Sequence, residues 1–331
     1  MSSSLELSVE HTFGSGLTLP VRLGYETYGV LNADRSNAIL LCHYYTGTSR
    51  VAGSFEDGSV GWWDALVGPG KSIDTQRFFV VCMNVLSNVQ VGDSSVISTG
   101  PATQAEDGLP YGDRFPRVSL RDNARLQHEL METLGISSWY AVIGPSYGGI
   151  QALMWGVLYP EATPRLGAIA CSPHSSVALQ STFYPLLQRV SQGENGTIEA
   201  LRLIGFYGLG ASGLEHVFFG ESFEAYLRVR ARFAQLSHIL SIGQTVSQYT
   251  VFETVERHEL FETWRRLGVR LLSVNIRGDQ FFPEKIMGNL AQETQSLGIS
   301  HEHMEIDSEV GHLACIQETH RFANAIDHLL M

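Results

Sequence analysis

The feature that most constrains the fold of this chain is a run of apolar residues that leads directly into Gly144-Pro145-Ser146-Tyr147-Gly148. The run WYAVI (139–143) is typical of a buried strand, and the apolar segment after Gly148 is typical of a helix that Pro160 ends. A G-x-S-x-G sequence between a strand and a helix indicates a sharp turn that holds the serine hydroxyl above the sheet. Glycines on both sides of the serine leave room for the backbone to turn. We therefore predict that Ser146 is a nucleophile.

Continuous apolar runs elsewhere in the chain predict the sheet to which this turn belongs. They are the segments 37–42, 77–83, 166–170 and 271–276, which are rich in β-branched and aromatic residues. Strands that are apolar on both faces are typical of a parallel sheet covered by helices. Segments 5–13 and 21–29 are expected to form an edge pair, and 301–306 a late strand. The sequence thus predicts an α/β chain with a mostly parallel, doubly wound sheet.

The helical segments divide the chain into a core and an insertion. Ser119 and Asp122 have the spacing of a helix N-cap pair, and Gly135 would stop that helix. Residues 173–263 carry amphipathic helical segments and glycine-rich joints but no core strand. We expect residues 1–172 and 264–331 to form the core domain. The insertion, residues 173–263, should be a helical lid over the carboxyl edge of the sheet, where α/β proteins bind ligands.

The partners of a nucleophilic serine are expected after it in the chain. A serine hydroxyl needs a base to remove its proton, and in the α/β-hydrolase fold an acid and then a histidine follow later strands. Asp279 comes directly after a predicted core strand, and His312 lies in the loop after the last predicted strand. Asp307 and Glu309 are rivals for the acid. The order Ser146, Asp279, His312 predicts an α/β-hydrolase fold in which His312 is the base and Asp279 orients it.

A tetrahedral intermediate on Ser146 carries an oxyanion, which needs two hydrogen-bond donors. We expect one to be the backbone amide of Tyr147, the residue after the nucleophile. The second should come from the loop after the strand 37–42, where Tyr45 is the best candidate. His43 in the same loop is expected to be structural or part of the crevice wall.

Several long segments, besides the turn at Ser146, resemble the homoserine O-acetyltransferases, a family of α/β-hydrolase-fold enzymes. They are LGYETYGVLNADRSNAILLCH (23–43), GWWDALVGPGKSIDTQRFFVVCMNVL (61–86) and STGP (98–101). The resemblance is close over residues 15–172 and looser over 264–331. It implies an acyl-CoA substrate that acylates Ser146, an alcohol acceptor, no bound cofactor, and a homodimer formed through the lid helices.

The chain departs from that family where the acceptor would bind. The resemblance implies an acidic residue directly after the histidine, where it would receive the ammonium group of homoserine, but here that residue is Leu313. A leucine cannot pair with a cation, so homoserine should be a poor acceptor. Tyr44 and Leu313 are expected to line an apolar substrate crevice. Arg228 is a candidate substrate-binding arginine in the lid, in a segment that also carries Arg230 and Arg232, although a solvated helix face would also explain these arginines.

Two functional interpretations follow. The first is an ester or thioester hydrolase, or an acyltransferase to an acceptor other than homoserine, that works through an acyl-Ser146 intermediate. The alternative is a homoserine or serine O-acetyltransferase that uses acetyl-CoA. An inactive binding protein is disfavoured because all three site residues are present. A nucleotide-binding oxidoreductase is disfavoured because GLGASG (208–213) lies in the lid and follows no core strand.

Charge and composition narrow the partners. The net charge of −12 argues against nucleic acid or an anionic membrane, so a small-molecule acyl donor and acceptor are the expected partners. No apolar run approaches about 18 residues and no basic start precedes an apolar stretch, so a cytoplasmic location is expected. The four cysteines are far apart and are expected to be reduced core residues. No third ligand is spaced to join His301 and His303, so no metal site is expected.

Overall fold

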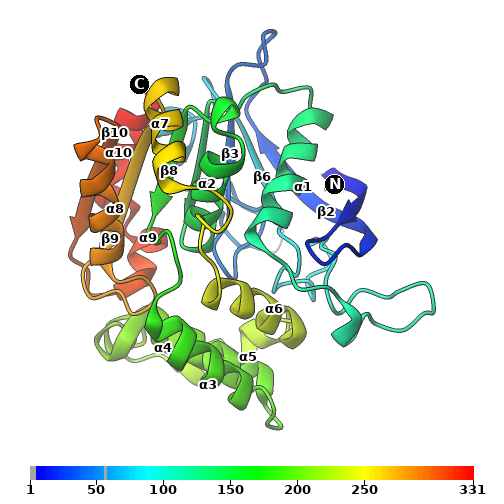
Figure 1. The fold of residues 1–331 in the computed structure, drawn as a ribbon. Helices are drawn as coiled ribbons and strands as arrows, with labels where there is room; N and C mark the ends of the chain where they lie inside the picture. Colours follow the sequence, from blue (N-terminus) through cyan, green and yellow to red (C-terminus); the bar gives the residue numbers. More distant parts are fainter. Residues whose placement is uncertain (1–4, 56–57) are drawn as a thin grey trace.

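The computed structural model describes residues 5–55 and 58–331 and is built around one eight-stranded sheet (Figure 1). In spatial order its strands are β1 (Leu5–Thr12), β2 (Thr18–Tyr28), β6 (Phe79–Met83), β3 (Ala38–Leu41), β7 (Ala141–Pro145), β8 (Arg165–Ile169), β9 (Arg270–Ile276) and β10 (Ser300–Ile306). The strands from β6 to β10 are parallel, and β2 is antiparallel to both of its neighbours. The prediction of a mostly parallel sheet is confirmed.

The N-terminal strands form the expected pair at the edge of the sheet. β1 is the outermost strand and is antiparallel to β2, and β2 joins the pair to the rest of the sheet by pairing with β6 through Tyr25–Tyr28. A second, two-stranded sheet is formed by β4 (Val67–Gly68) and β5 (Ile73–Asp74).

Helices cover both faces of the main sheet, so it is doubly wound as predicted. Along β3, Leu40 packs into one hydrophobic core, whereas Ile39 and Leu41 pack into a second core on the other face. The first core includes residues of α1 (Leu120–Thr133), α2 (Tyr147–Leu158) and α8 (Glu284–Ser296), and the second includes residues of α10 (Ala323–Leu330). Ser119 and Asp122 form the predicted capping box of α1.

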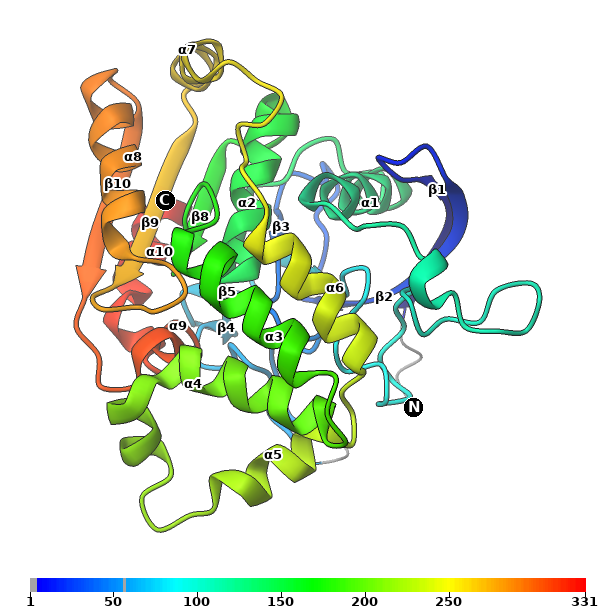
Figure 2. The same cartoon turned by 60° about the horizontal axis from the view of Figure 1, so that its bottom comes forward.

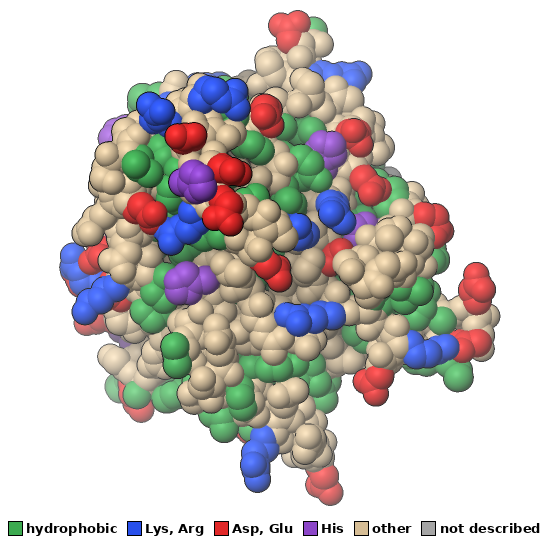
Figure 3. Space-filling view, viewed as in Figure 1, with side chains coloured by type: hydrophobic (Ala, Val, Ile, Leu, Met, Phe, Trp, Pro, Cys, Tyr) green, Lys and Arg blue, Asp and Glu red, His purple; other side chains and the backbone are tan. Residues whose placement is uncertain are grey.

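Four helices lie together at one end of the sheet (Figures 1 and 2). They are α3 (Tyr184–Val190), α4 (Gly196–Val217), α5 (Phe223–Ala231) and α6 (Leu236–Ser247), preceded by a π-helical turn, Leu179–Phe183. We call this group the lid helices. On the face drawn in Figure 3, charged side chains gather over the upper half of the molecule. The surface over the lid helices carries fewer charged side chains, and hydrophobic side chains are exposed among them.

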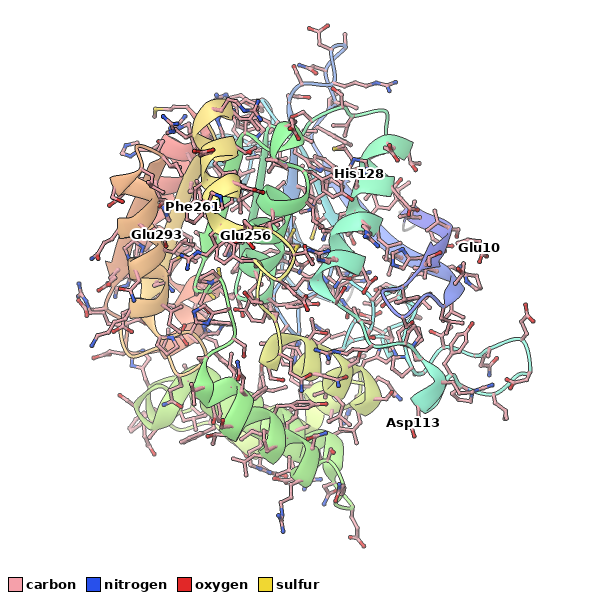
Figure 4. The ribbon with its side chains drawn as sticks, in the orientation of Figure 1. Glu10, Asp113, His128, Glu256, Phe261 and Glu293 are labelled. Carbon is pink, nitrogen blue, oxygen red and sulfur yellow. The ribbon has the colours of Figure 1, made fainter. Side chains whose placement is uncertain are left out.

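The last helix of the insertion, α7 (Arg257–Leu267), is attached to the sheet layer instead of the lid. Figure 4 places Glu256, which directly precedes α7, and Phe261 of α7 beside Glu293 on α8. Arg257 forms an ion pair with Glu293, and the Trp264 indole donates to the carbonyl of Gly156 on α2 at 2.7 Å. The predicted boundary between residues 263 and 264 therefore falls inside a helix.

The chain after β10 forms several short helical segments. It forms a 3₁₀ turn at Gly311–Leu313, then α9 (Ala314–Gln317), another 3₁₀ turn at Thr319–Arg321, and α10. None of the helices in the described part of the chain is both long and apolar enough to cross a membrane.

Candidate active site

Ser146 occupies a strained turn between β7 and α2. Its backbone has φ 57° and ψ −123°, a conformation that residues with a side chain rarely adopt. Its amide donates to the carbonyl of Ile169 on the neighbouring strand at 2.7 Å. A Cβ added to Gly148 would lie 1.9 Å from the carbonyl oxygen of Cys42, and one added to Gly144 would lie 2.6 Å from the same oxygen. Both glycines are therefore needed for the backbone to pack beneath the serine.

Three side chains from separate loops form one hydrogen-bonded series. Nε2 of His312 lies 2.8 Å from Oγ of Ser146, and Nδ1 of His312 lies 2.6 Å from Oδ2 of Asp279. The other oxygen of Asp279, Oδ1, accepts hydrogen bonds from the amides of Phe281 and Phe282 at 2.8 and 3.1 Å. The carboxylate is thus fully partnered although its side chain is buried. This arrangement can take a proton from Ser146 and stabilise the resulting imidazolium.

The two rival acids lie elsewhere. Asp307 forms an ion pair with Arg277 at 2.7 Å, and Glu309 faces His216 at 3.4 Å, both at the surface. The rings of Phe281 and Phe282 pack against the imidazole of His312, with centroids 5.1 and 5.5 Å away. These rings shield the hydrogen bond between His312 and Asp279 from water, which strengthens it.

The two expected oxyanion donors lie on the wall of the cavity that contains Ser146. Across the described residues, the backbone amides of Tyr45 and Tyr147 have no hydrogen-bond acceptor. The side chains of both tyrosines are engaged elsewhere, because the Tyr45 hydroxyl donates to the carbonyl of Ile239 on α6 and the Tyr147 hydroxyl accepts from Asn123. The backbone amides of Tyr45 and Tyr147 are therefore the groups of these residues that can donate hydrogen bonds to an oxyanion in the cavity.

A buried polar network lies behind the loop that carries Tyr45. Nδ1 of His43 donates to the carbonyl of Tyr44 at 2.8 Å, because Nε2 accepts from the amides of Val85 and of the Asn88 side chain. Burial lowers the pKa of His43 to about 4, so the ring is neutral at neutral pH. His43 is thus structural, one of the two roles expected for it.

Asn88 links this loop to the lid helices. Its side-chain amide also donates to the carbonyl of Gly47 at 2.9 Å, and its backbone carbonyl accepts from Nδ1 of His238 on α6 at 2.8 Å. Nothing in the sequence singles out Asn88 or His238, because their partners lie far away along the chain.

The cavity above Ser146 has a volume of about 430 Å³. Tyr44 and Leu313 line it, as predicted. Arg228 does not, because it forms an ion pair with Glu224 at 2.8 Å on the outer side of α5. The prediction for this residue is corrected: the arginine on the cavity wall is Arg230, two positions later, which lies on another side of the helix.

Other candidates from the sequence lie outside this site. His301 and His303 both hydrogen-bond to Ser273 Oγ, at 2.8 and 2.7 Å, and no group of three metal-binding side chains is found in the described part of the chain. All four cysteines are free and buried. The glycine-rich segment 208–213 lies within α4, where Gly210 forms a kink with φ 66°, and it does not join a strand to a helix.

A family model described as the alpha/beta hydrolase fold matches residues 37–319 of the chain. The chain belongs to the α/β-hydrolase family. Among characterised members, it is 48% identical over 179 residues to the homoserine O-acetyltransferase of Thermobifida fusca. That match covers 53% of this chain and 45% of the relative, so this α/β-hydrolase aligns with less than half the length of that protein.

Two kinds of solved structure resemble this α/β-hydrolase over nearly its whole length. The homoserine O-acetyltransferase from Bacillus anthracis superimposes with a TM-score of 0.88 at 30% identity, covering 99% of this chain and 97% of that one. Esterase E22 and its leucine-to-aspartate variant superimpose with a TM-score of 0.88 at 28% identity, covering 99% of both chains. The comparisons therefore include both acyltransferases and an esterase.

Proposed function

We propose that this α/β-hydrolase cleaves carboxylic esters or thioesters through an acyl-Ser146 intermediate. The observation that carries the proposal is the hydrogen-bonded series from Ser146 through His312 to Asp279, which opens into a cavity that Leu313 lines beside the histidine. The names of the relatives favour a homoserine O-acyltransferase instead. The side chain of Leu313 favours hydrolysis or a less polar acceptor, because it offers no partner to an ammonium group.

The proposed reaction has two steps. Ser146 Oγ forms a bond to the acyl carbon while its proton passes to His312 Nε2, and the amides of Tyr45 and Tyr147 stabilise the oxyanion. The bond to the leaving alcohol or thiol then breaks, and that group takes the proton from His312. A water molecule, or an acceptor alcohol, repeats the sequence on the acyl-enzyme. The acid or the new ester leaves, and the Ser146 hydroxyl is restored.

The second candidate, a homoserine O-acyltransferase, is supported by two charged side chains on the cavity wall. Arg230 could bind the carboxylate of an amino acid, and Glu221 its ammonium group. Measuring the release of CoA from acetyl-CoA with and without L-homoserine separates the two candidates. Release that depends on homoserine would favour the transferase, whereas turnover of simple esters without such release would favour the hydrolase.

Replacing Leu313 with aspartate should improve homoserine as an acceptor. The carboxylate would stand directly after His312, where it can pair with the ammonium group, and we expect homoserine-dependent CoA release to rise at least about tenfold. Leu313→Asn is the matched control, because it is polar and similar in size but carries no charge. An equal response of the two variants, or no response, would contradict the role given to Leu313.

Removing the side-chain amide of Asn88 should slow the reaction without weakening substrate binding. The variant Asn88→Ala frees the carbonyl of Gly47 and one contact of His43, so the Tyr45 amide should lose its fixed position. Because removing an oxyanion donor outright costs about 10²–10³ in kcat, we expect a loss of roughly 10- to 100-fold in kcat with little change in KM.

The control for this variant is Asn289→Ala, the same change on the exposed surface of α8. Both proteins should be assayed by ester hydrolysis at a temperature where thermal unfolding shows them folded. A change confined to KM, or a loss of activity that only follows the loss of folded protein, would reject the positioning role of Asn88.

A further inference from the structure

We infer that the acyl group of the substrate is an apolar chain longer than acetyl, which lies in an inner arm of the cavity beneath α4. This inference rests on the proposed function and specifies its substrate class. It is drawn from the side chains that α4, α5 and α6 present to the cavity, from their burial, and from the position of the charged groups.

One face of α4 is apolar and lines the cavity. Its lining residues at the N-terminal end are Leu201, Ile204, Gly205 and Gly208. Their spacing of i, i+3, i+4 and i+7 places them in one stripe along the helix. Leu201 and Ile204 also pack against the hydrophobic core, and Phe223 lies over Gly205. The rest of the stripe borders the cavity, where it offers an apolar wall to a ligand.

The stripe runs away from the reacting atoms. A Cβ added to Gly208 would lie 2.9 Å from Cδ1 of Leu313, so this end of the stripe stands beside His312. Leu201 is seven residues earlier, which at the helical rise is about 10 Å further along the axis and corresponds to a chain of roughly six to eight carbons.

Buried apolar side chains of two other lid helices also line the cavity. Leu227 on α5 and Val246 on α6 are 1% and 2% exposed, and Leu201 on α4 is also buried. None of the residues of the stripe, nor these two, carries a charge or a polar side chain. Burying a carboxylate among them without a partner would cost free energy, so the arm suits a hydrocarbon chain.

Apart from the buried Ser146 and His312, several polar side chains of the cavity lie toward solvent. Glu221, Tyr226 and Gln317 line the cavity and are exposed, so they mark its mouth. Arg230 is only partly buried and lies close enough to Tyr44 to act on its pKa. A polar leaving group or acceptor would therefore find its partners near the mouth, and the acyl chain would occupy the inner arm.

The test is a chain-length series of p-nitrophenyl esters from acetate to decanoate. We expect kcat/KM to rise about three- to fourfold for each added methylene while the arm is filling, and then to fall once the chain outgrows it. The variant Leu201→Phe should shorten the arm and lower the ratio of kcat/KM for hexanoate over acetate at least about tenfold. Leu203→Phe, on the same helix but off the cavity wall, should leave that ratio unchanged.

The outcomes separate this inference from the proposed function. Hydrolysis that is fastest with acetate and declines steadily with chain length would overturn the inference and leave the esterase proposal standing. If no ester of any length is hydrolysed, both fail. Should Leu201→Phe not fold, the wild-type series decides alone, because a maximum at intermediate length is expected only if an apolar arm of limited depth receives the chain.

Discussion

Replacing Ser146 with alanine is expected to lower kcat for ester hydrolysis by about 10⁴- to 10⁶-fold. No acyl-enzyme can form without the Ser146 hydroxyl. Ser146, His312 and Asp279 act together, so the loss of one of them removes most of the effect of all three. The fold should be kept, because alanine removes only one oxygen atom and the backbone strain at this position is unchanged.

The measurement is steady-state hydrolysis of a p-nitrophenyl ester by wild type, Ser146→Ala and Ser296→Ala, the last being a serine exposed at the end of α8. Mass spectrometry after brief incubation with substrate should find an acyl adduct on wild type and on Ser296→Ala only. Activity in Ser146→Ala close to that of wild type would reject Ser146 as the nucleophile. An absence of all turnover in wild type would support a binding protein instead.

The second large effect is a loss of stability in mild acid. Burial lowers the pKa of His43 and of His238 to about 4, and that of His301 to about 3, from an ordinary value of 6.5. Both ring nitrogens of His301 contact hydroxyl groups, those of Ser273 and Thr294. The rings of His43 and His238 are held neutral by bonds in which one nitrogen must accept, as Nε2 of His238 does from the amide of Ala102 at 3.1 Å. Protonation would remove that acceptor and leave a charge in the interior.

The direction of this pH dependence follows from the number of protons that the folded and unfolded chains bind. Below pH 6.5 the unfolded chain takes up protons at these three histidines that the folded chain does not, so the free energy of unfolding falls as the pH falls. Stability is complete above pH 6.5, declines through the range down to about pH 4 for His43 and His238, and down to about pH 3 for His301. Three protons correspond to about 4 kcal/mol per pH unit at the steepest point.

Urea unfolding at pH 7 and pH 5 measures this effect. The variant His301→Gln should lose about one third of the pH dependence of the free energy of unfolding. The unfolded chain of this variant takes up two protons at these positions instead of three. The matched surface change is His258→Gln, at an exposed histidine of α7, which should retain the full dependence. Equal stability of wild type at the two pH values would show that the three histidines are not held neutral as described.

Much of the fold follows from local sequence patterns. The strand-turn-helix around Ser146 is recognisable because a tight turn of this kind tolerates only glycine at 144 and 148, and this requirement is local. The parallel sheet is recognisable because strands covered on both faces must be apolar throughout. The edge pair of β1 and β2 is recognisable as well, but its attachment to β6 is not, because that pairing depends on a neighbour about 55 residues away.

The candidate site divides in the same way. The positions of Ser146, Asp279 and His312 relative to predicted strands and loops are visible in the sequence. The sequence favours Asp279 over its rivals only through its place after a core strand, and the tertiary structure supplies the contact, because it places Asp279 2.6 Å from His312 and turns Asp307 toward Arg277. It likewise places Arg230 on the cavity wall, whereas the sequence offered Arg228, Arg230 and Arg232 in one segment.

The sequence by itself determined the elements and the order of the chemical groups, since backbone strain, hydrophobic periodicity and chain order are properties of neighbouring residues. Only the tertiary structure determined which groups meet. Asn88 contacts His43, Gly47 and His238 across up to 150 residues, and the apolar stripe of α4 lines a cavity. Such contacts depend on how helices and loops pack against one another, and no local pattern records that packing.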